Sequence, residues 1–303
     1  MSEPRRCGTI ALIGAPNAGK STLLNRLVSS KVSIVTPKVQ TTRARVLGIL
    51  MRGAAQLIFV DTPGIFAPRR RLDRAMVGSA WGSAKEADIV TLVIDAGKGV
   101  QENLPADDEA ILSGLKDVRV AKVLVLNKVD LVDKPKLLAM TQMLNERETF
   151  LATFMISALS GNGVADLKSF LAAHVPEGPW LYPEDQISDA PLRQLAAEIT
   201  REKLYLRLHQ ELPYQSTVET EVWKELKDGS VRIEQTIYVE RESQRPIVLG
   251  KRGQTLKWIG EHARKDLAGI LDRPVHLFLT VKVKENWSEA REFYSGIGLD
   301  YDA

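Results

Sequence analysis

Short apolar segments recur between Thr9 and His174, separated by stretches with helical periodicity. The segments are rich in β-branched residues and have the sequences TIALI, RVLGILM, QLIFV, DIVTLVI, AKVLVLN and ATFMIS. Continuous apolar runs are typical of strands buried on both faces, and amphipathic stretches between them favour crossover helices. We therefore expect residues 1–175 to form an α/β domain, in which helices cover a doubly wound, mostly parallel sheet.

The pattern changes at residues 176–191, PEGPWLYPEDQISDAP, where prolines are frequent and core-forming residues are scarce. Proline fixes the backbone in extended conformations and removes hydrogen-bond donors, so this segment is predicted to be an extended linker.

Residues 192–303 contain a different order of elements. We expect a helix over 192–209, two strands joined by a turn at 227–230, another helix, and a last strand over 275–283 that is apolar at every second position. The inward face of the second helix is predicted to consist of Leu256, Ile259, Ala263, Leu267 and Ile270. This order predicts a separate α+β domain. The acidic tail after it, 285–302, is expected to be a solvated end.

Composition limits what the chain can bind. Lys and Arg number 41 and Asp and Glu 38, a net charge of +3, so attraction to a polyanion must come from local clustering. Cys7 is the single cysteine, which excludes an internal disulfide and favours the cytoplasm. No apolar run approaches the roughly 18 residues of a membrane span, and the N-terminus lacks a signal-peptide layout. The histidines show no ligand spacing, so we expect no zinc site.

GAPNAGKS, residues 14–21, matches G-x-x-x-x-G-K-[ST] between a predicted strand and a predicted helix. In that context backbone N–H groups and the helix N-terminus face phosphates, Lys20 reaches the β and γ oxygens, and the Ser21 hydroxyl is offered to Mg²⁺. The alternative is a glycine-rich turn that only caps a helix. The predicted phosphate-binding residues here are Gly14, Ala15, Pro16, Asn17, Ala18, Gly19, Lys20 and Ser21.

NKVD, residues 127–130, follows the predicted strand KVLVL, and open α/β sheets bind ligands at the carboxyl ends of their strands. Asn127 can bond to the O6/N7 edge of a purine. A buried Asp130 carboxylate would accept from N1–H and the amino group of guanine, which adenine lacks. A surface turn is the alternative for this tetrapeptide alone. The predicted guanine-binding residues, which include a loop after the next strand, are Asn127, Lys128, Asp130, Ser157, Ala158 and Leu159.

Together with DTPG at 61–64 and the pair Thr41-Thr42, these motifs resemble the sequence blocks of the translation-factor-like GTPases. The resemblance implies that Asp61 holds Mg²⁺ through water, that the Gly64 N–H meets the γ-phosphate, and that Thr41 or Thr42 coordinates Mg²⁺ in the triphosphate state. We favour Thr42. The implied switch loops, 31–43 and 64–74, would be released on hydrolysis. The residues assigned to the switch regions are Thr41, Thr42, Asp61, Thr62, Pro63, Gly64 and Ile65.

Ile65 and Phe66 stand where many small GTPases have a glutamine that orients the attacking water. Positioning and charge neutralisation supply most of the catalysis of phosphoryl transfer, so an apolar residue lowers the rate without abolishing the reaction. The resemblance points to GTPases in which an asparagine at the position of Asn17 binds K⁺ beside the phosphates. The alternative is that Asn17 only stabilises the loop.

Gly250-Lys251-Arg252-Gly253 forms a G-x-x-G motif within IVLGKRGQTLKWIG. Glycine has no Cβ, so such a turn lets an RNA backbone approach closely while the two cations neutralise phosphates. The segment and the order of elements resemble a type II KH domain. The surrounding charge alone would also fit a solvated face. The predicted RNA-binding residues are Gly250, Lys251, Arg252, Gly253, Lys257 and Arg245.

A GTPase domain, a Pro-rich linker and a type II KH domain in this order resemble the Era family of bacterial GTPases over essentially the whole chain. The resemblance implies slow, Mg²⁺-dependent GTP hydrolysis, binding of 16S ribosomal RNA near its 3′ end, and a role in assembly of the small (30S) ribosomal subunit. It implies no DNA partner, and a cytoplasmic protein that associates peripherally with the inner membrane. A constitutive KH-type RNA-binding regulator with a structural GTPase domain is the alternative.

Overall fold

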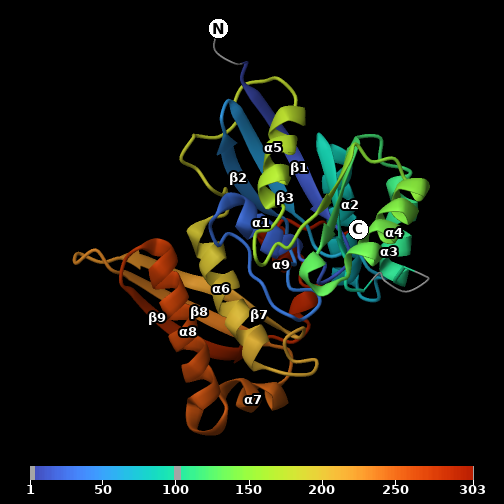
Figure 1. Ribbon diagram of the computed structural model, residues 1–303. Coiled ribbons are helices and arrows are strands. Elements are labelled where there is room, and N and C mark those ends of the chain that lie inside the picture. The colour runs from blue at the N-terminus through green and yellow to red at the C-terminus, as the bar shows by residue number, and fades with distance from the viewer. Residues whose placement is uncertain (1–3, 99–103, 303) are drawn as a thin grey trace. The chain divides into compact units, whose positions relative to one another are not determined.

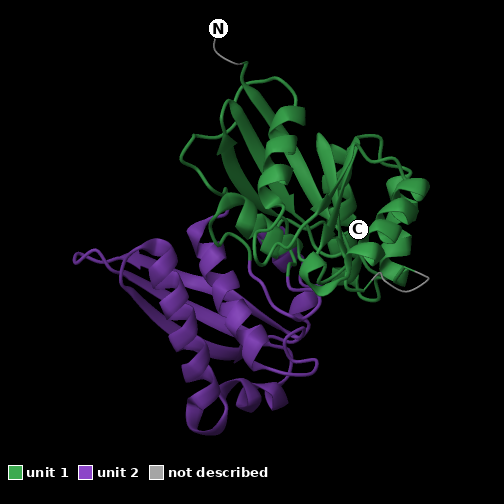
Figure 2. Ribbon diagram, in the orientation of Figure 1, with its two compact units in different colours: residues 1–33, 42–189, 297–303 green, residues 34–41, 190–296 purple. Residues whose placement is uncertain are grey.

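The computed structural model describes residues 4–98 and 104–302. They fall into two compact units (Figure 2). The first comprises Met1–Ser33, Thr42–Asp189 and Ile297–Ala303, and the second comprises Ile34–Thr41 and Ala190–Gly296. A short segment of the N-terminal part of the chain therefore groups with the second unit, and the C-terminal residues group with the first.

The first unit is built on a mixed sheet (Figure 1). Its strands in the described residues are β1 (Arg6–Ile13), β2 (Val46–Arg52), β3 (Ala55–Asp61), β4 (Ile89–Asp95), β5 (Ala121–Asn127) and β6 (Ala152–Met155). The strand order is β2-β3-β1-β4-β5-β6, and β2 is antiparallel to β3 whereas the other pairs are parallel. Strands β3 and β4 are buried along their whole length, which explains their continuous apolar sequence. The predicted α/β fold is confirmed.

Helices cover both faces of this sheet. They are α1 (Lys20–Val28), α2 (Arg71–Glu86), α3 (Ala106–Leu115), α4 (Lys134–Arg147) and α5 (Val164–His174), with a 3-10 turn η1 (Val129–Leu131). Leu23 of α1 and Leu171 of α5 belong to one apolar cluster. Ala80 of α2, Ile111 of α3 and Leu144 of α4 belong to the other. The predicted nucleotide motifs begin at or directly after the carboxyl ends of β1, β3 and β5.

The segment predicted as a linker is extended, and most of it is fastened to the first unit. The Gln56 side chain accepts the N–H groups of Leu181 and Tyr182 at 2.8 and 3.0 Å and donates to the Tyr182 carbonyl at 2.8 Å. The boundary between the units falls after Asp189. Side-chain amides that bond to backbone in this way hold a chain that has no secondary structure of its own.

The second unit has the α-β-β-α-α-β order of a type II KH domain. Its elements are α6 (Leu192–Arg207), β7 (Ser216–Glu225), β8 (Val231–Val239), η2 (Glu242–Gln244), α7 (Arg245–Leu249), η3 (Lys251–Gly253), α8 (Gln254–Leu271), β9 (Val275–Val283), η4 (Trp287–Glu289) and α9 (Arg291–Gly296). The sheet order is β7-β8-β9, antiparallel then parallel. Helices α6 and α8 lie side by side over one face of it (Figure 1).

The prediction that residues 285–302 form a solvated end is wrong. Trp287 and Tyr294 are each 1% exposed. The Trp287 indole donates to the Gln215 carbonyl at 3.1 Å, and the Tyr294 hydroxyl donates to the Ser288 carbonyl at 2.8 Å. The aromatic residues outweigh the acidic ones because their buried area supplies most of the packing energy. No helix within residues 4–98 and 104–302 is long and apolar enough to cross a membrane.

Candidate functional site

The predicted phosphate-binding loop joins β1 to α1. A Cβ on Gly14 would lie 2.2 Å from the Val93 carbonyl oxygen, and one on Gly19 would lie 2.2 Å from Asn127 Nδ2. Gly19 also has a φ of +98° and precedes the first turn of α1. Only glycine fits at both positions. The tight turn directs backbone N–H groups and the helix N-terminus to one point, which is the geometry of an anion site.

Lys20 is buried beneath this loop. Its ammonium donates to the carbonyls of Gly14 and Ala15 at 2.9 and 3.0 Å. Burial lowers the pKa of Lys20 to about 8, and the carboxylates of Asp61 and Asp108 oppose the shift. A polyphosphate at this position would add the negative charge that restores a fully protonated lysine.

Asp61, at the end of β3, is the centre of a cluster of hydroxyl groups. Its Oδ2 accepts from Ser21 Oγ at 2.6 Å and from Ser33 Oγ at 2.8 Å, and Thr42 Oγ1 lies at 3.5 Å. Ser21 Oγ and Thr42 Oγ1 are 2.9 Å apart. The Thr41 hydroxyl instead bonds to the Thr36 hydroxyl and the Lys38 carbonyl. Of the two candidate threonines, Thr42 is therefore the one beside Asp61.

This cluster fits Mg²⁺. Burial raises the pKa of Asp61 despite the hydroxyl groups that bond to it. Among the described residues its Oδ1 is buried without a hydrogen-bond partner. A carboxylate and two hydroxyl groups are hard oxygen ligands of the kind that Mg²⁺ prefers, and a hydrated cation would satisfy the unpaired oxygen.

Residues 62–65 lie against the phosphate-binding loop. The Thr62 hydroxyl donates to the Leu12 carbonyl at 2.7 Å, and the Ile65 N–H donates to the Gly14 carbonyl at 3.1 Å. A Cβ on Gly64 would lie 2.9 Å from the Pro16 nitrogen. The Ile65 side chain is 4% exposed and belongs to the core. Its apolar character therefore has a packing reason.

Asn127 joins three loops. Its Nδ2 donates to the Ala18 carbonyl at 2.8 Å, and its Oδ1 accepts the Ala158 N–H at 2.9 Å. The neighbouring Lys128 has a φ of +63°, and its ammonium donates to the Asn17 carbonyl at 2.8 Å and to Asp95 Oδ2 at 2.7 Å. The sequence argument assigned base contacts to Asn127 and did not foresee this bracing. The position of Asp95 at the end of β4 was the signal for its involvement.

Asp130 is exposed, which differs from the buried carboxylate that we expected. Strand β5 ends at Asn127, so Asp130 lies beyond the sheet edge in η1. The Asp130 carboxylate would therefore become buried only when a guanine base binds against it. The N–H groups of Ser157 and Ala158 are engaged by Asn162 and Asn127, which leaves the N–H of Leu159 as the candidate donor to guanine O6.

In the second unit, the G-x-x-G turn has a conformation that depends on glycine. Gly250 has a φ of +74°, and a Cβ there would lie 2.2 Å from the Thr255 hydroxyl oxygen. Gly253 has a φ of +76°, with open space around it. Lys251 and Arg252 are exposed between them. The turn therefore carries two exposed cationic side chains, and its glycines allow an RNA sugar-phosphate backbone to approach closely.

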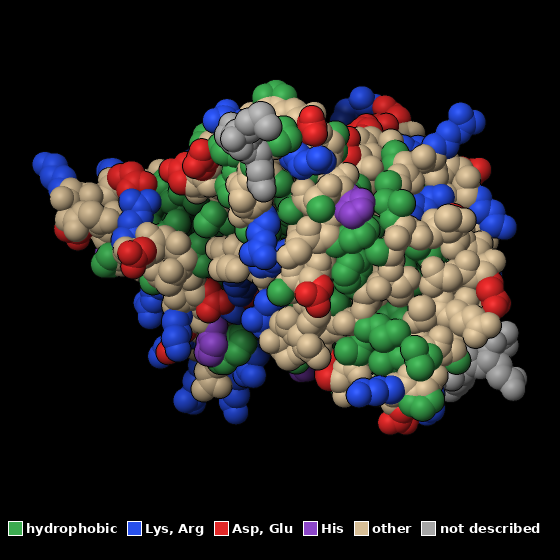
Figure 3. Space-filling view, turned by 45° about the horizontal axis from the view of Figure 1, so that its top comes forward, with side chains coloured by type: hydrophobic (Ala, Val, Ile, Leu, Met, Phe, Trp, Pro, Cys, Tyr) green, Lys and Arg blue, Asp and Glu red, His purple; other side chains and the backbone are tan. Residues whose placement is uncertain are grey.

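A groove of about 580 Å³ lies beside this turn, between α8 and β9. Its apolar lining includes Leu256, Leu277 and Leu279, and its charged lining consists of Lys257, Arg264 and Glu261. Basic side chains gather toward the lower left of the face in Figure 3, and elsewhere they alternate with acidic ones. Arg245 begins α7 and is exposed, outside the groove lining. An apolar floor with cationic groups suits unstacked bases joined by phosphates.

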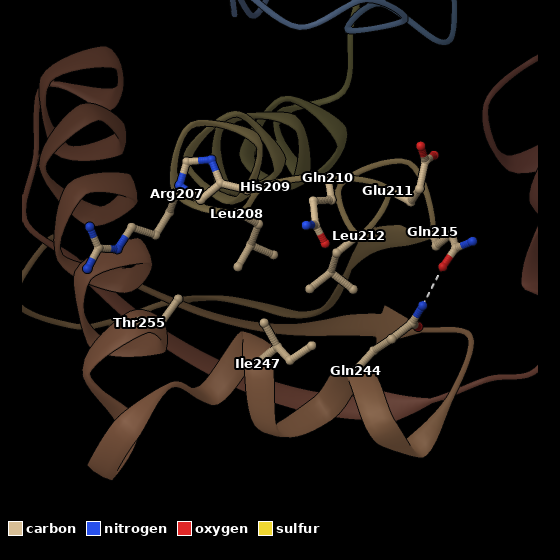
Figure 4. A pocket seen from close by; sticks show the side chains of 10 residues that line it. All are labelled: Arg207, Leu208, His209, Gln210, Glu211, Leu212, Gln215, Gln244, Ile247 and Thr255. Atoms are coloured by element: carbon tan, nitrogen blue, oxygen red, sulfur yellow. Dashed lines mark hydrogen bonds between the residues drawn. The ribbon is translucent and has the colours of Figure 1, made fainter.

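A second hollow of about 570 Å³ is lined by the end of α6, the loop after it and α7 (Figure 4). Leu208, Leu212 and Ile247 point into it, and the side chains of Gln215 and Gln244 are hydrogen-bonded at its edge. The hollow separates the C-terminal end of α6 from α7. Nearby, Trp258 is half-buried and stacks on His262 with ring centroids 3.9 Å apart.

These features define a two-unit protein with a P-loop GTPase fold and a KH fold. The family model described as "50S ribosome-binding GTPase" matches residues 9–128, and the model described as "KH domain" matches residues 211–288. GTPase Era of Brucella suis biovar 1 (strain 1330) is 66% identical over 296 residues, 98% of this chain and 94% of the relative. GTPase Era of Rhizobium meliloti (strain 1021) is 62% identical over 298 residues, 98% and 94% of the two chains. The chain belongs to the Era family and is a GTPase.

Two solved structures are similar over nearly the whole chain. Era in complex with MgGDPNP and nucleotides 1506–1542 of 16S ribosomal RNA is 39% identical, with a TM-score of 0.91 and coverage of 97% of this chain and 99% of the other. A variant of Aquifex aeolicus Era bound to GDP and AlF4⁻ is also 39% identical, with a TM-score of 0.90 and the same coverage. The predicted family and the predicted GTPase activity are confirmed.

Proposed function

We propose that this GTPase binds 16S ribosomal RNA near its 3′ end and acts in assembly and maturation of the 30S subunit, with GTP and GDP controlling its hold on the RNA. RNA binding is supported by the glycine-dependent turn that contains Lys251 and Arg252, and by the groove with an apolar floor beside it. A relative bound to nucleotides 1506–1542 of that RNA supports the choice of partner.

In the nucleotide site, the loop over 14–21 holds the phosphates and the Gly64 N–H meets the γ-phosphate. Asn127, Lys128 and Asp130 form the guanine end with the loop at 157–159. Ser21 and Thr42 bind Mg²⁺ directly, and Asp61 binds it through water. When bound, Mg²⁺ neutralises charge on the β and γ oxygens.

K⁺, held by Asn17 and by carbonyls of the segment 31–43, supplies further positive charge to the transition state. The absence of a side-chain donor at Ile65 supports this proposal, since another source of stabilisation is then needed. Hydrolysis is faster in K⁺ than in Na⁺ at equal ionic strength, and Asn17→Ala removes the difference. Equal rates of the unaltered protein in the two salts would exclude the role of K⁺.

The rival function is a constitutive RNA-binding regulator. Crosslinking the protein to RNA in cells and sequencing the attached RNA separates the two, because an assembly factor recovers the 3′ region of 16S ribosomal RNA. Recovery of messenger RNA would favour the regulator. A cytoplasmic location follows from this function, and peripheral association with the inner membrane stays a prediction that cell fractionation tests.

A further inference from the structure

The segment 34–41, here called the strap, connects two residues of the hydroxyl cluster. Ser33 precedes it and Thr42 follows it, and the hydroxyl groups of both lie at Asp61 Oδ2, at 2.8 and 3.5 Å. The strap itself groups with the second unit. The residues on either side of the strap thus lie at the predicted metal site, and the strap between them bonds to residues of the second unit.

Those other residues belong to α6 and the loop after it. Ile34 is 2% exposed and packs in an apolar cluster with Ala196 and Ile199. The Val35 N–H donates to Glu202 Oε1 at 2.9 Å. The Lys38 ammonium donates to the carbonyls of Tyr205 and Leu208, the latter at 2.8 Å.

The fourth anchor is Arg201, whose Nη2 donates to the Thr41 carbonyl at 2.6 Å. Its side chain is 1% exposed and ion-paired with Glu198. Burial acts against its charge, but the Glu198 carboxylate outweighs burial and raises the pKa of Arg201 above its ordinary value. Arg201 therefore remains a charged donor. Its guanidinium carbon also lies over the Tyr205 ring, 5.1 Å from the ring centroid.

We propose that Arg201 and Lys38 are positioning residues for the GTPase reaction, because they hold the strap whose last residue, Thr41, is joined by a peptide bond to Thr42. Arg201 acts through the Thr41 carbonyl, one peptide bond before Thr42, and Lys38 fixes the middle of the strap. The proposal rests on the role of Thr42 as a Mg²⁺ ligand in the triphosphate state.

The effect has a definite thermodynamic form. A loop of this length that is free in solution loses backbone entropy each time Thr42 must be fixed, and the anchors on α6 reduce that loss in advance. Removing an anchor therefore weakens Mg²⁺ binding with GTP. It leaves the affinity for GDP unchanged, because the guanine end and the phosphate-binding loop do not involve the strap.

The test uses the full chain and measures GTP hydrolysis as a function of Mg²⁺ concentration. In Arg201→Ala and Lys38→Ala the Mg²⁺ concentration for half-maximal rate rises about tenfold or more, as expected for loss of a hydrogen bond from a charged donor. Arg201→Lys restores part of the loss. GDP affinity stays within twofold. Arg193→Ala is the matched control, since this exposed arginine of α6 also donates to backbone carbonyls but outside the strap.

Thr42→Ala is the reference variant. If it raises the Mg²⁺ requirement while both anchor variants leave it unchanged, the positioning proposal is overturned and the metal assignment stands. If Thr42→Ala changes nothing, the metal assignment itself fails and the proposal falls with it. Lys38 is only half-buried, so Lys38→Ala keeps the test decisive even if Arg201→Ala does not fold.

Discussion

Asn127 Nδ2 and the carbonyl of Ala18 are joined by a hydrogen bond of 2.8 Å, which ties the guanine end of the site to the phosphate-binding loop. The other side-chain atom of Asn127 accepts the Ala158 N–H. One buried amide therefore holds the ends of three different loops. Both partners of this amide are backbone groups, so the two bonds depend on the side chain of Asn127 alone.

Asn127→Ala should accordingly cost more than one base contact. The variant leaves the Ala18 carbonyl and the Ala158 N–H without their partner, and each such loss costs about 1–3 kcal/mol. We expect affinity for GDP to fall by at least about 100-fold and affinity for pyrophosphate to fall as well. Isothermal titration with both ligands measures this. An unchanged affinity for pyrophosphate would show that Asn127 acts on the base alone.

Asp130→Asn should change the choice of base without disturbing the phosphates. Asp130 is exposed, and the hydrogen bonds described above that join the loops of the site involve Asn127 and not Asp130. An amide at this position can donate to the C2 carbonyl of xanthine but cannot accept from both guanine donors. We expect GDP affinity to fall about 100-fold and XDP to bind more tightly than GDP. Parallel loss of both nucleotides would contradict the role of Asp130 in base selection.

Lys251→Ala and Arg252→Ala should weaken RNA binding in a way that depends on salt. Each removes one exposed cation from the G-x-x-G turn, and a phosphate contact on a single strand contributes a slope of about −0.7 in the logarithm of affinity against that of salt. Each variant should therefore reduce the steepness of that slope by this amount. Lys227→Ala, at the exposed turn between β7 and β8, is the control. An unchanged slope in both turn variants would show that the RNA does not contact this turn.

Asp108→Asn should stabilise the first unit at high pH. Burial, followed by the Asp107 carboxylate, raises the pKa of Asp108 to about 6, and its Oδ1 is buried without a hydrogen-bond partner among the described residues. The folded protein binds this proton more tightly than the unfolded chain does, so stability is full below pH 4 and declines as the pH rises through 6. Removing the charge should add about 1–2 kcal/mol at pH 8, after discounting for solvent screening.

The measurement for Asp108→Asn is urea unfolding at pH 8 and at pH 4.5, with Asp117→Asn as the exposed control. At pH 4.5 the gain should be much smaller than at pH 8, because Asp108 is then protonated in the folded protein and the proton is lost only on unfolding. A gain of the same size at both pH values would mean that the charge of Asp108 is not the cause.

The elements that sequence reasoning found are those whose signal is local. Strands β3 and β4 are continuous apolar runs because both faces are buried, and strand β9 alternates because only one face is. The phosphate-binding loop and the G-x-x-G turn were found since glycine at Gly14 and Gly250 is required by the backbone itself. In each case a few consecutive residues carry the whole physical reason.

What the sequence could not provide depends on contacts between distant residues. The strap has no periodicity of its own, and its anchor Arg201 stands 160 positions away from Thr41. Arg201, Glu202 and Lys203 are charged residues of types that are mostly exposed in proteins, yet all three are buried. Ser33 likewise gave no motif that would place it on Asp61. The polar groups of such residues bond to partners that are distant in the sequence and come close only in the folded chain.

The central claim is that the terminal phosphate of GTP in one unit changes how strongly the other unit holds RNA. The most direct measurement is the affinity of the full chain for a labelled oligonucleotide from the single-stranded 3′ end of 16S ribosomal RNA, at millimolar Mg²⁺. We expect binding at least about fivefold tighter with a non-hydrolysable GTP analogue than with GDP, a typical size for coupled sites. Equal affinities in the two nucleotide states would contradict the account.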